Sequence, residues 1–598
     1  MNDARPEPLP FDADAVREKY RIEREKRLNP KGSAQYRQLS GELSHFTADP
    51  YTPRIERSPV EDLVDVAIIG GGFGGLLVGA RLREVGLDRI RILEQGGDVG
   101  GAWYWNRYPG VRCDVESYIY MPLLEETGFI PTEKYAKGSE IHAHAQRIAK
   151  QFDLYRDALL QTRVTGVDFD DETALWTVST DRGDRCQARY VVMTGGALSD
   201  PKLPGVEGIE TFRGHSFHTT RWDYDYTGGS SDGALTGLAD KRVGVIGTGA
   251  TAIQVVPQVG AAAQQLFVFQ RTPAAVNVRG NRPTDPLWVK TLKPGWQRER
   301  IENFSAYIAG ADVDTDLVND TWTWLYRSQN LRGGALGDEE DLEKMEEVRA
   351  RVSRVVTDPA VAEKLKPWYP ALCKRPTFHD EYLGTFNRPN VTLVDTDGRG
   401  VEAITERGVV AGGVEYELDC LIFASGFTTA WAPFSVRYGY DVRGRGGLSL
   451  SAKFEQGMAT LYGMQTHGFP NFFVMALNQV GNSVNQTHVL EVQSRHIAAL
   501  VGEAHRRDAS LIEPTAEAEQ AWVDTIYEVS RVAAAFLNTC TPSYFNNEGQ
   551  ADAEKFRREG FYAPGIVAFD RLVEAWRATG CWSGVLFDGL PAECADAE

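Results

Sequence analysis

Two short apolar runs of the chain are each followed at once by a glycine-rich turn and then by an apolar pattern of helical spacing. The first set comprises a run at 64–69, a helical pattern at 76–85 and a second run at 90–93. The second set comprises a run at 243–246, a helical pattern and a run at 266–269. Strand, turn, helix and strand in this order form a β-α-β unit of a parallel sheet. The pattern therefore predicts two such units in one chain.

The remaining segments also divide into strand and helix patterns. Residues 176–179 and 190–193 predict strands between the two units, and strands return at 391–394 and 420–424. Residues 287–366 lack strand alternation and predict helices, as does the C-terminal tail. We therefore expect an α/β protein with two nested Rossmann-like domains, the second inserted within the first.

The N-terminal region differs from this core. Residues 11–28 are charge-dense, with sparse apolar positions at Val16, Tyr20 and Ile22, which predicts a solvated helix. From there to Pro59 the periodicity is weak. This part is expected to be an extension that wraps the core, most simply as a structural arm.

Composition places the chain among ordinary globular proteins. It has 598 residues, of which 42% are hydrophobic and 25% are charged, and these values exclude a disordered or a fibrous chain. The net charge of −19 argues against a nucleic-acid partner, because a phosphate-binding surface needs an excess of basic residues.

Cysteine usage and the N-terminus bear on the compartment. No two of the seven cysteines are spaced C-x-x-C, so we expect reduced thiols in a cytoplasmic protein. The polar start shows no secretory signal. The stretch 63–80 is long enough for a membrane span, but Asp65 and six glycines suit a strand–turn–helix better. We expect a soluble protein with no membrane association and no metal.

The first glycine turn, at residues 70–75, reads G-G-G-F-G-G, a G-x-G-x-x-G between strand and helix. Gly70 permits the tight turn, Gly72 lets backbone approach a pyrophosphate, and Gly75 lets the helix pack close to the strand. Glu94 closes the second strand 19 residues after Gly75, where a carboxylate binds ribose hydroxyls and repels a 2′-phosphate. The context favours a site for FAD or NAD over a structural glycine turn.

The second turn reads G-T-G-A-T-A, in which Gly247, Gly249 and Ala252 hold the fixed positions of the G-x-G-x-x-A variant. Arg271, followed by Thr272, stands 19 residues after Ala252 in place of an acid. An arginine there favours a 2′-phosphate through charge-assisted hydrogen bonds. This site suits NADPH, and a solvated surface cation is the alternative interpretation of Arg271.

Two sites of opposite preference in one chain indicate electron flow from NADPH to a bound flavin. Flavin disulfide reductases share this layout, but they need a redox-active cysteine pair, and no C-x-x-C is present. The reduced flavin would then react with oxygen or another acceptor.

A segment between the two turns carries the most specific motif. The twelve residues from Phe212 to Asp223 fit F-x-G-x-x-x-H-x-x-x-W-D, with Gly214, His218 and Trp222 at the other fixed positions. The motif resembles the fingerprint of the type I Baeyer–Villiger monooxygenases, whereas relatives that oxygenate amines and sulfides typically have Tyr in place of Trp222. The resemblance implies that His218 positions the nicotinamide domain and takes no part in bond-making.

Two further segments agree with this family. Residues 100–110 (G-G-A-W-Y-W-N-R-Y-P-G), followed by C-D-V-E-S, resemble its flavin-covering segment. On that resemblance we expect Gly101, Trp103 and Tyr120 at the FAD, and Asp114 as a buried acid that helps hold the active-site arginine.

Lys374 and Arg375 match the family's Lys-Arg pair, which would otherwise be interpreted as solvated surface. The resemblance implies that Lys374 reaches the NADPH 2′-phosphate beside Arg271, and that Arg375 is the catalytic arginine beside the flavin. The N-terminal extension and residues 540–549 resemble the subgroup of cyclopentadecanone monooxygenase and the terpenoid-lactone synthases. That subgroup implies a bulky cyclic ketone: macrocyclic, terpenoid or steroid.

The resemblance covers about residues 60–590 and sets four expected segments. They are an N-terminal extension at 1–59, the first part of an FAD-binding domain at 60–211, an NADP-binding domain at 212–384 with a helical insertion at about 287–366, and the second part of the FAD-binding domain with a C-terminal helical region at 385–598.

The implied reaction is conversion of a ketone to an ester or lactone with FAD, NADPH and O2, through a C4a-peroxyflavin whose anion attacks the carbonyl. Three alternatives stay open: an N- or S-oxygenating flavin monooxygenase, which Trp222 disfavours, an NADPH oxidase or quinone reductase, and a non-enzymatic flavin sensor. The expected partners are the ketone and O2, in a monomer or small homo-oligomer. The loops at 428–434 and 481–487 are candidates for lining the ketone pocket.

Overall fold

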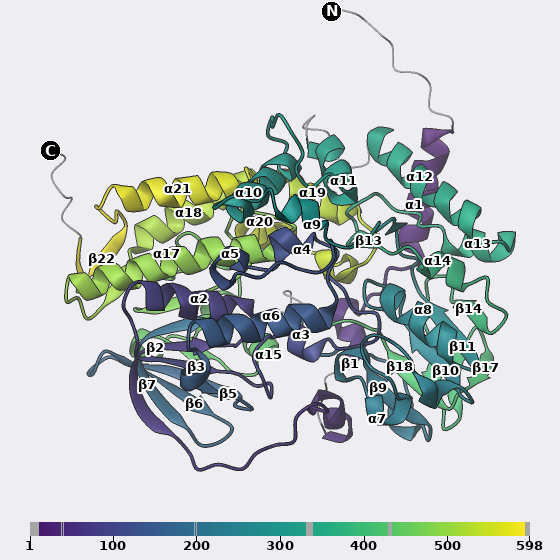
Figure 1. Ribbon diagram of the computed structural model, residues 1–598, viewed down its shortest axis with the longest axis horizontal. Coiled ribbons are helices and arrows are strands. Elements are labelled where there is room, and N and C mark those ends of the chain that lie inside the picture. The colour runs from purple at the N-terminus through teal and green to yellow at the C-terminus, as the bar shows by residue number, and fades with distance from the viewer. Residues whose placement is uncertain are drawn as a thin grey trace, which may run out of the picture.

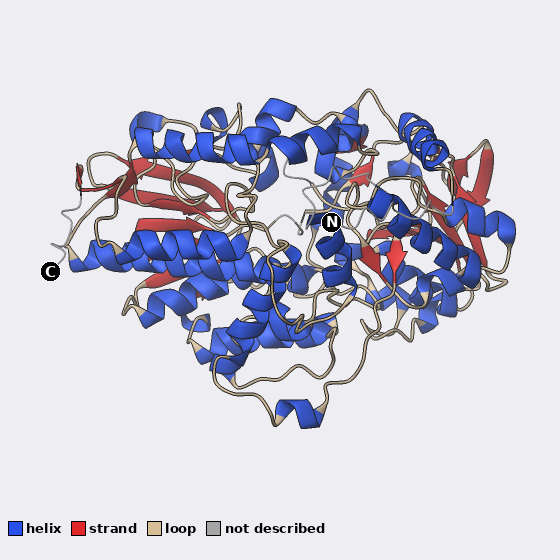
Figure 2. Ribbon diagram, turned by 90° about the horizontal axis from the view of Figure 1, so that it is seen from above, coloured by secondary structure: helices blue, strands red, loops and turns tan. Residues whose placement is uncertain are grey.

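The computed structural model describes residues 11–37, 39, 41–196, 198, 200–330, 339–428 and 433–591. Within them, the chain forms two main sheets that lie beside each other, one mixed and one all parallel, each with helices packed against it (Figures 1 and 2). This is the α/β architecture with two dinucleotide-binding units that the two glycine turns predict.

The first sheet has the strand order β19-β5-β6-β7-β2-β3-β4, and β20 also pairs with β7. β2 (Glu61–Ile69) lies between β3 (Ile90–Leu93) and β7 (Arg185–Met193), and all three run parallel. The other strands are β4 (Ala158–Leu159), β5 (Val164–Asp170), β6 (Leu175–Thr180), β19 (Val442–Arg443) and β20 (Phe472–Val474). α2 (Phe73–Glu84) is almost wholly buried because it packs between this sheet and α17 (Gln486–Arg506).

The second sheet has the order β14-β11-β10-β18-β9, and all of its strands run parallel. They are β9 (His215–His218), β10 (Arg242–Ile246), β11 (Gln265–Gln270), β14 (Val391–Asp395) and β18 (Cys420–Phe423). α8 (Ala252–Ala262) covers one face. β20 of the first sheet follows β18 of the second along the chain, so the second unit is inserted within the first, as predicted.

The NADP-binding domain was expected to end at residue 384. The second sheet continues beyond this residue, so the expected boundary lies too early in the chain. β14 pairs with β11 and β18 pairs with β10, so both strands belong to the nucleotide unit that contains the second turn. Between them, β15 (Ala403–Ile404), β16 (Gly408–Ala411) and β17 (Val414–Glu417) form a small antiparallel sheet. An apolar run records only that a strand is buried on both faces, and it does not tell which sheet the strand joins.

The helical insertion is confirmed. It comprises α9 (Pro286–Val289), α10 (Trp296–Ile308), α11 (Thr321–Asn330), α12 (Glu339–Val355) and α13 (Pro359–Leu365). The C-terminal region adds α18 (Ala516–Val529), α19 (Arg531–Thr539), α20 (Ala553–Glu559) and α21 (Ile566–Ala578).

The N-terminal extension lies against the second unit. α1 (Ala13–Glu25) is the predicted helix, and its Val16 and Tyr20 are buried against Leu342 of α12. Further on, β1 (Tyr36–Arg37) pairs with β8 (Leu203–Pro204). The extension thereby reaches the end of the second sheet where Arg271 lies, as the next section describes.

The expectation that all cysteines are reduced is wrong, because Cys373, Cys540 and Cys581 are disulfide-bonded. Cys373 and Cys540, which are 167 residues apart, form a disulfide. Cys113, Cys186 and Cys420 are free and buried. A disulfide between distant segments has no local spacing motif, so the absence of C-x-x-C could not exclude it.

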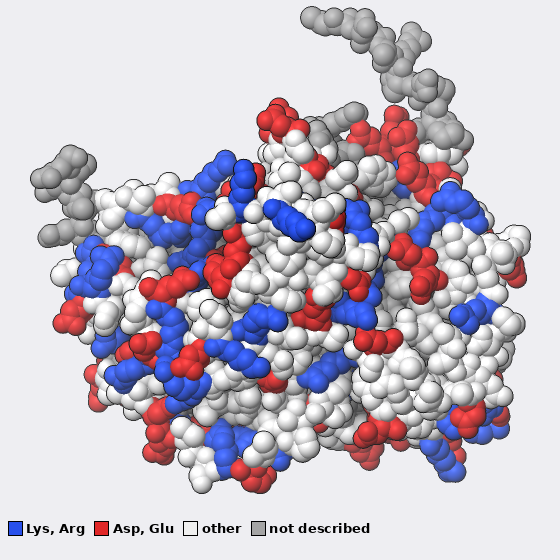
Figure 3. All heavy atoms as spheres, viewed as in Figure 1, with Lys and Arg blue, Asp and Glu red and all other residues white. Residues whose placement is uncertain are grey.

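Surface charge and helix length complete the description. On the face drawn in Figure 3, acidic and basic side chains are interspersed and no continuous basic area is visible among the described residues. Within the same residues, no helix is both long and apolar enough to cross a bilayer.

Candidate active site

The first glycine turn connects β2 to α2 in the way a pyrophosphate site requires. Gly70 has a φ of +110°, and a Cβ on Gly75 would lie 1.9 Å from the carbonyl oxygen of Gly70, so no side chain fits where helix and strand cross. A Cβ on Gly101 would lie 2.8 Å from the Cα of Gly72. This close backbone approach at the start of α2 fits a bound dinucleotide phosphate, because helix N-termini present free N–H groups.

Glu94 lies at the end of β3, beside the same turn. Its carboxylate accepts hydrogen bonds from the backbone N–H groups of Gly71 (2.6 Å) and Gly96 (2.7 Å). Burial raises the pKa of this carboxyl, although the two N–H groups act in the opposite direction. Glu94, the acid predicted to accept hydrogen bonds from the ribose, therefore lies inside the turn in a fixed orientation.

Two aromatic residues of the predicted flavin-covering segment contact each other. Trp103 lies on α3 (Ala102–Trp105) and Tyr120 ends α4 (Ser117–Tyr120). The Trp103 indole Nε1 donates to the Tyr120 hydroxyl at 3.0 Å, and the rings meet edge to face.

Arg375 and Asp114 are brought together from positions 261 residues apart. The Arg375 guanidinium donates to both carboxylate oxygens of Asp114, at 2.6 and 2.8 Å. Trp322 of α11 donates its indole N–H to the Asp114 carbonyl oxygen at 2.8 Å, and its ring centroid lies 5.7 Å from the guanidinium carbon. Burial lowers the pKa of Arg375, but the carboxylate outweighs it and the net pKa is raised, so the guanidinium keeps its charge.

The second glycine turn has the same form at the end of β10. Gly247 has a φ of +115°, and a Cβ there would lie 2.4 Å from the carbonyl oxygen of Ala424. A Cβ on Gly249 would meet no atom within 4 Å, so the turn faces open space at the position where backbone approaches a pyrophosphate. The turn is tied to the end of β11 because Thr248 Oγ1 donates to the Thr272 carbonyl oxygen at 2.7 Å.

A cluster of cations lies at the end of β11, and we call it the cation pocket: Arg271, Lys202 and Lys374, with the acid Glu548 among them. Arg271 Nη2 donates to Glu548 Oε2 at 2.9 Å, and Lys202 Nζ lies 3.8 Å from Glu548 Oε1. Lys374 Nζ donates to the Pro542 carbonyl oxygen at 3.3 Å. The pocket therefore gathers residues from four separate parts of the chain.

Burial and mutual repulsion destabilise the charge on both lysines. Burial lowers the pKa of Lys374 to about 7, and Arg271 contributes in the same direction. Burial likewise lowers the pKa of Lys202 to about 8. For Glu548, burial acts to raise the pKa, but the three cations outweigh it, and the net pKa lies below its ordinary value.

The N-terminal extension forms one wall of the cation pocket. Arg271 Nη1 donates to the Gln35 side-chain oxygen (3.0 Å) and to the Tyr36 hydroxyl (3.4 Å), and Lys202 Nζ lies 3.5 Å from the centroid of the Tyr36 ring. Arg27 donates to Thr272 Oγ1 at 3.1 Å. The extension therefore does more than brace the fold, because it lines a site.

The fingerprint residues lie on and beside β9, the edge strand of the second sheet. His218 ends β9 and is fully buried, which lowers its pKa to about 3. Trp222 is 1% exposed and donates to Thr227 Oγ1 at 3.0 Å. Asp223 caps α7 (Tyr224–Thr227) and lies 2.8 Å from His215 Nε2.

Phe212 and Gly214 precede this strand. A Cβ on Gly214 would lie 2.5 Å from the Phe212 ring, so the glycine is required for that ring to pack. These contacts fix the local packing of the motif, and its role in positioning the nicotinamide domain stays a prediction.

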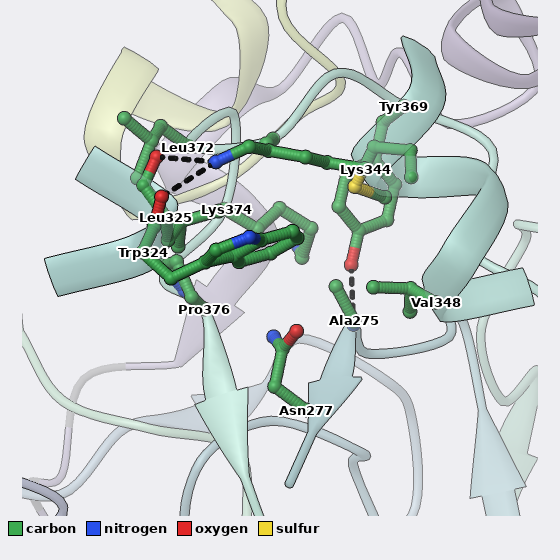
Figure 4. A pocket seen from close by; sticks show the side chains of 12 residues that line it. Ala275, Asn277, Trp324, Leu325, Lys344, Val348, Tyr369, Leu372, Lys374 and Pro376 are labelled. Atoms are coloured by element: carbon green, nitrogen blue, oxygen red, sulfur yellow. Dashed lines mark hydrogen bonds between the residues drawn. The ribbon is translucent and has the colours of Figure 1, made fainter. Parts of the chain in front are cut away.

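A small cavity lies beside Lys374 and Pro376, between α11, α12 and β12 (Val276–Asn277) (Figure 4). Tyr369 and Lys344 line the cavity, and the Lys344 ammonium donates hydrogen bonds to the carbonyl oxygens of Trp324 and Leu325. Its volume of about 10 Å³ accommodates one water molecule. The cavity is too small for a ketone. Of the loops nominated to line the ketone pocket, 429–432 lie outside the described residues.

Five residues of the site and the disulfide beside it were not identified from the sequence. The residues are Gln35, Tyr36, Lys202, Trp322 and Glu548, and the disulfide is Cys373–Cys540. A signal existed for Glu548, because the segment 540–549 had been singled out by resemblance. The other residues have no local pattern.

Comparison with known proteins first defines the class. A family model described as pyridine nucleotide-disulphide oxidoreductase matches residues 67–303, which include both glycine turns. This match agrees with two nested nucleotide units.

Full-length relatives define the family. The chain is 53% identical over 591 residues to pentalenolactone D synthase of Streptomyces arenae, covering 96% of this chain and 100% of that protein. It is 50% identical over 580 residues to a Baeyer-Villiger monooxygenase of Streptomyces coelicolor, covering 94% and 95%. The solved polycyclic ketone monooxygenase of Thermothelomyces thermophila matches with a TM-score of 0.90 and 41% identity, covering 96% and 98%. The chain belongs to the Baeyer–Villiger monooxygenases.

Proposed function

We propose that this protein converts a bulky cyclic ketone into a lactone, with FAD and NADPH as cofactors and O2 as oxidant. The observation that carries the proposal is an arginine held by a carboxylate in a chain that also has two dinucleotide turns of opposite preference. A solved relative of 28% identity is a complex with FAD and NADP, which supports the same pair of cofactors. FAD bound at the first turn and reduced by NADPH would supply the electrons that activate O2, and O2 would supply the oxygen atom that enters the ketone.

The two turns would hold the two cofactors. The FAD residues are Gly70, Gly72, Gly75, Glu94, Gly101, Trp103, Asp114 and Tyr120. The NADPH residues are Gly247, Gly249, Ala252, Arg271, Thr272 and Lys374. Glu94 would accept hydrogen bonds from the FAD ribose, whereas Arg271 and Lys374 would bind the 2′-phosphate of NADPH.

Arg375 would stabilise negative charge at the reacting centre. Attack on a carbonyl converts its oxygen into an anion, and a preorganised cation lowers the energy of that state. A guanidinium can do this without giving up a proton, because it stays protonated at any working pH. The hydrogen bonds from Arg375 to the Asp114 carboxylate fix the orientation of the guanidinium plane. The hydrogen bond from the Trp322 indole to the Asp114 carbonyl oxygen fixes the backbone of Asp114.

The names of the relatives support the ketone class, since one is a polycyclic ketone monooxygenase and another a lactone synthase. A monomer or small homo-oligomer stays a prediction. The test is turnover of a graded set of ketones under ¹⁸O2 with NADPH. A polycyclic or macrocyclic ketone should give a lactone with one ¹⁸O atom and a higher kcat/KM than cyclohexanone. Oxygenation of amines or sulfides without any lactone would contradict the proposal.

A further inference from the structure

Glu548 is a buried acid that lies where the proposed function needs the 2′-phosphate of NADPH to bind. Its side chain is 5% exposed, and its carboxylate lies among Arg271, Lys202 and Lys374. An acid is rarely buried to this degree unless cations compensate it, and here three cations surround one carboxylate. The pocket therefore carries a surplus of positive charge even with Glu548 present.

Both terminal nitrogens of Arg271 are already engaged. Nη1 donates to Gln35 and Tyr36 of the N-terminal extension, and Nη2 donates to Glu548. A bidentate contact with a phosphate uses the N–H groups of one edge of the guanidinium, either Nη1 with Nη2 or Nε with Nη2, so the nitrogen that Glu548 binds belongs to both edges. The Glu548 carboxylate thus occupies a position on Arg271 that a 2′-phosphate would take.

The backbone at Glu548 is held in a conformation that L side chains rarely adopt. Asn547 and Glu548 have φ values of +50° and +56°, and Gly549 follows at +87°. Such left-handed residues persist only where surrounding contacts impose them. Asn546 supplies these contacts, since its side chain accepts from the N–H groups of Ser543 and Gly549 and donates to three carbonyl oxygens of residues 537–541.

The same segment is attached to the loop that carries Lys374. Cys540 is joined to Cys373, the residue before Lys374, and Ser543 Oγ donates to the Cys373 carbonyl oxygen at 3.0 Å. The strained turn and the lysine are therefore fixed relative to each other. This arrangement aims the Glu548 carboxylate at the cation pocket and keeps it there.

We propose that Glu548 is the internal counter-ion of the 2′-phosphate site, and that NADPH must displace its carboxylate from Arg271 in order to bind. The inference rests on the proposed function, in which Arg271 and Lys374 bind that phosphate. A phosphomonoester carries nearly two negative charges at neutral pH and can replace one carboxylate. A nucleotide with a free 2′-hydroxyl brings no charge to this position, so it leaves the Arg271–Glu548 pair intact. Glu548 therefore sets the affinity for phosphorylated nucleotides selectively.

The test compares the binding of NADP+ and NAD+ to the oxidised, FAD-loaded enzyme by titration calorimetry. Glu548→Gln keeps the shape of the side chain and removes the competing charge. It should tighten NADP+ binding by about tenfold, the low end of what one charge-assisted hydrogen bond contributes, and leave NAD+ binding within twofold. Glu528→Gln, the same change at an exposed position of α18, is the matched control and should alter neither constant.

Unchanged or weaker NADP+ binding in a folded Glu548→Gln enzyme would overturn the inference, because it would show that the carboxylate supports the site. If that variant does not fold, Glu548→Asp withdraws the carboxylate by one methylene and should also tighten NADP+ binding. Arg271→Ala distinguishes a failure of the proposed phosphate site from a failure of the proposed role of Glu548. Equal losses of NADP+ and NAD+ affinity in Arg271→Ala would refute the phosphate site itself, whereas a selective NADP+ loss with no gain in Glu548→Gln would refute only the role of Glu548.

Discussion

Asp114→Asn should damage lactone formation while leaving the earlier steps of the cycle in place. The substitution keeps the size of the side chain but removes the charge that orients Arg375 through two hydrogen bonds of 2.6 and 2.8 Å. An amide has one acceptor oxygen, and its NH2 group would face the guanidinium N–H groups. The arginine then loses one contact and gains a repulsive one.

The magnitude follows from the burial of the pair. Removing one partner of a buried ion pair costs about 3–5 kcal/mol, but exposed pairs contribute far less. The Asp114 and Arg375 side chains are 12% and 35% exposed, so this pair lies between the two limits. We expect a loss of about 1–3 kcal/mol in transition-state stabilisation, which is roughly 5- to 150-fold in the rate of lactone formation.

The assay measures three quantities on the FAD-loaded variant: flavin reduction by NADPH in a stopped-flow instrument, lactone formed per NADPH consumed, and hydrogen peroxide released. Flavin reduction should stay within a few-fold of the unsubstituted enzyme, whereas the lactone yield should fall and peroxide should rise. Asp524→Asn, at an exposed position, is the control. Normal lactone yield per NADPH in a folded Asp114→Asn enzyme would refute the claim that Asp114 positions Arg375.

Three further outcomes are expected. Arg271→Ala should raise KM for NADPH by about tenfold or more and leave KM for NADH nearly unchanged, because a charge-assisted hydrogen bond contributes about 1.5–3 kcal/mol. Equal effects on the two KM values in steady-state kinetics would contradict this. NADP+ affinity, measured by titration, should fall as the pH rises above about 7, because Lys374 has a pKa of about 7 in the free enzyme and must take up a proton to meet a phosphate. NAD+ affinity should not fall, and Lys374→Arg should remove the part of the dependence near pH 7 and leave the part that Lys202, with a pKa of about 8, contributes. Cys540→Ser should lower the free energy of unfolding by about 2–4 kcal/mol in a urea titration. Reductant, which also opens the disulfide at Cys581, should lower that of the unsubstituted protein by at least as much, and no effect of either would show that the Cys373–Cys540 bond does not contribute.

The parts of the fold that the sequence predicts are those with local causes. The two glycine turns need strand, turn and helix within about thirty residues, and the structure confirms both. The helical insertion likewise follows from periodicity along one segment. The boundary after residue 384 failed, because β14 and β18 join the second sheet through contacts that no local pattern encodes.

The site shows the same division. Arg271 could be found by counting from Ala252, since the geometry of a β-α-β unit fixes that distance. Resemblance to a family was needed for Arg375 and Asp114, because their pairing joins residues 261 positions apart. The walls of the cation pocket come from the N-terminal extension and from the turn at Glu548. Only the assembled fold places these segments beside Arg271.

The central claim is that Arg375 stabilises the charge formed when the ketone is attacked, and Arg375→Ala tests it most directly. The measurement is lactone formed per NADPH consumed, with a polycyclic ketone in excess and with Arg407→Ala as the exposed control. We expect that the variant retains FAD, still oxidises NADPH and releases hydrogen peroxide, while lactone formation falls by roughly 100- to 1000-fold. A near-normal lactone yield per NADPH would contradict it and remove Arg375 from the reacting centre.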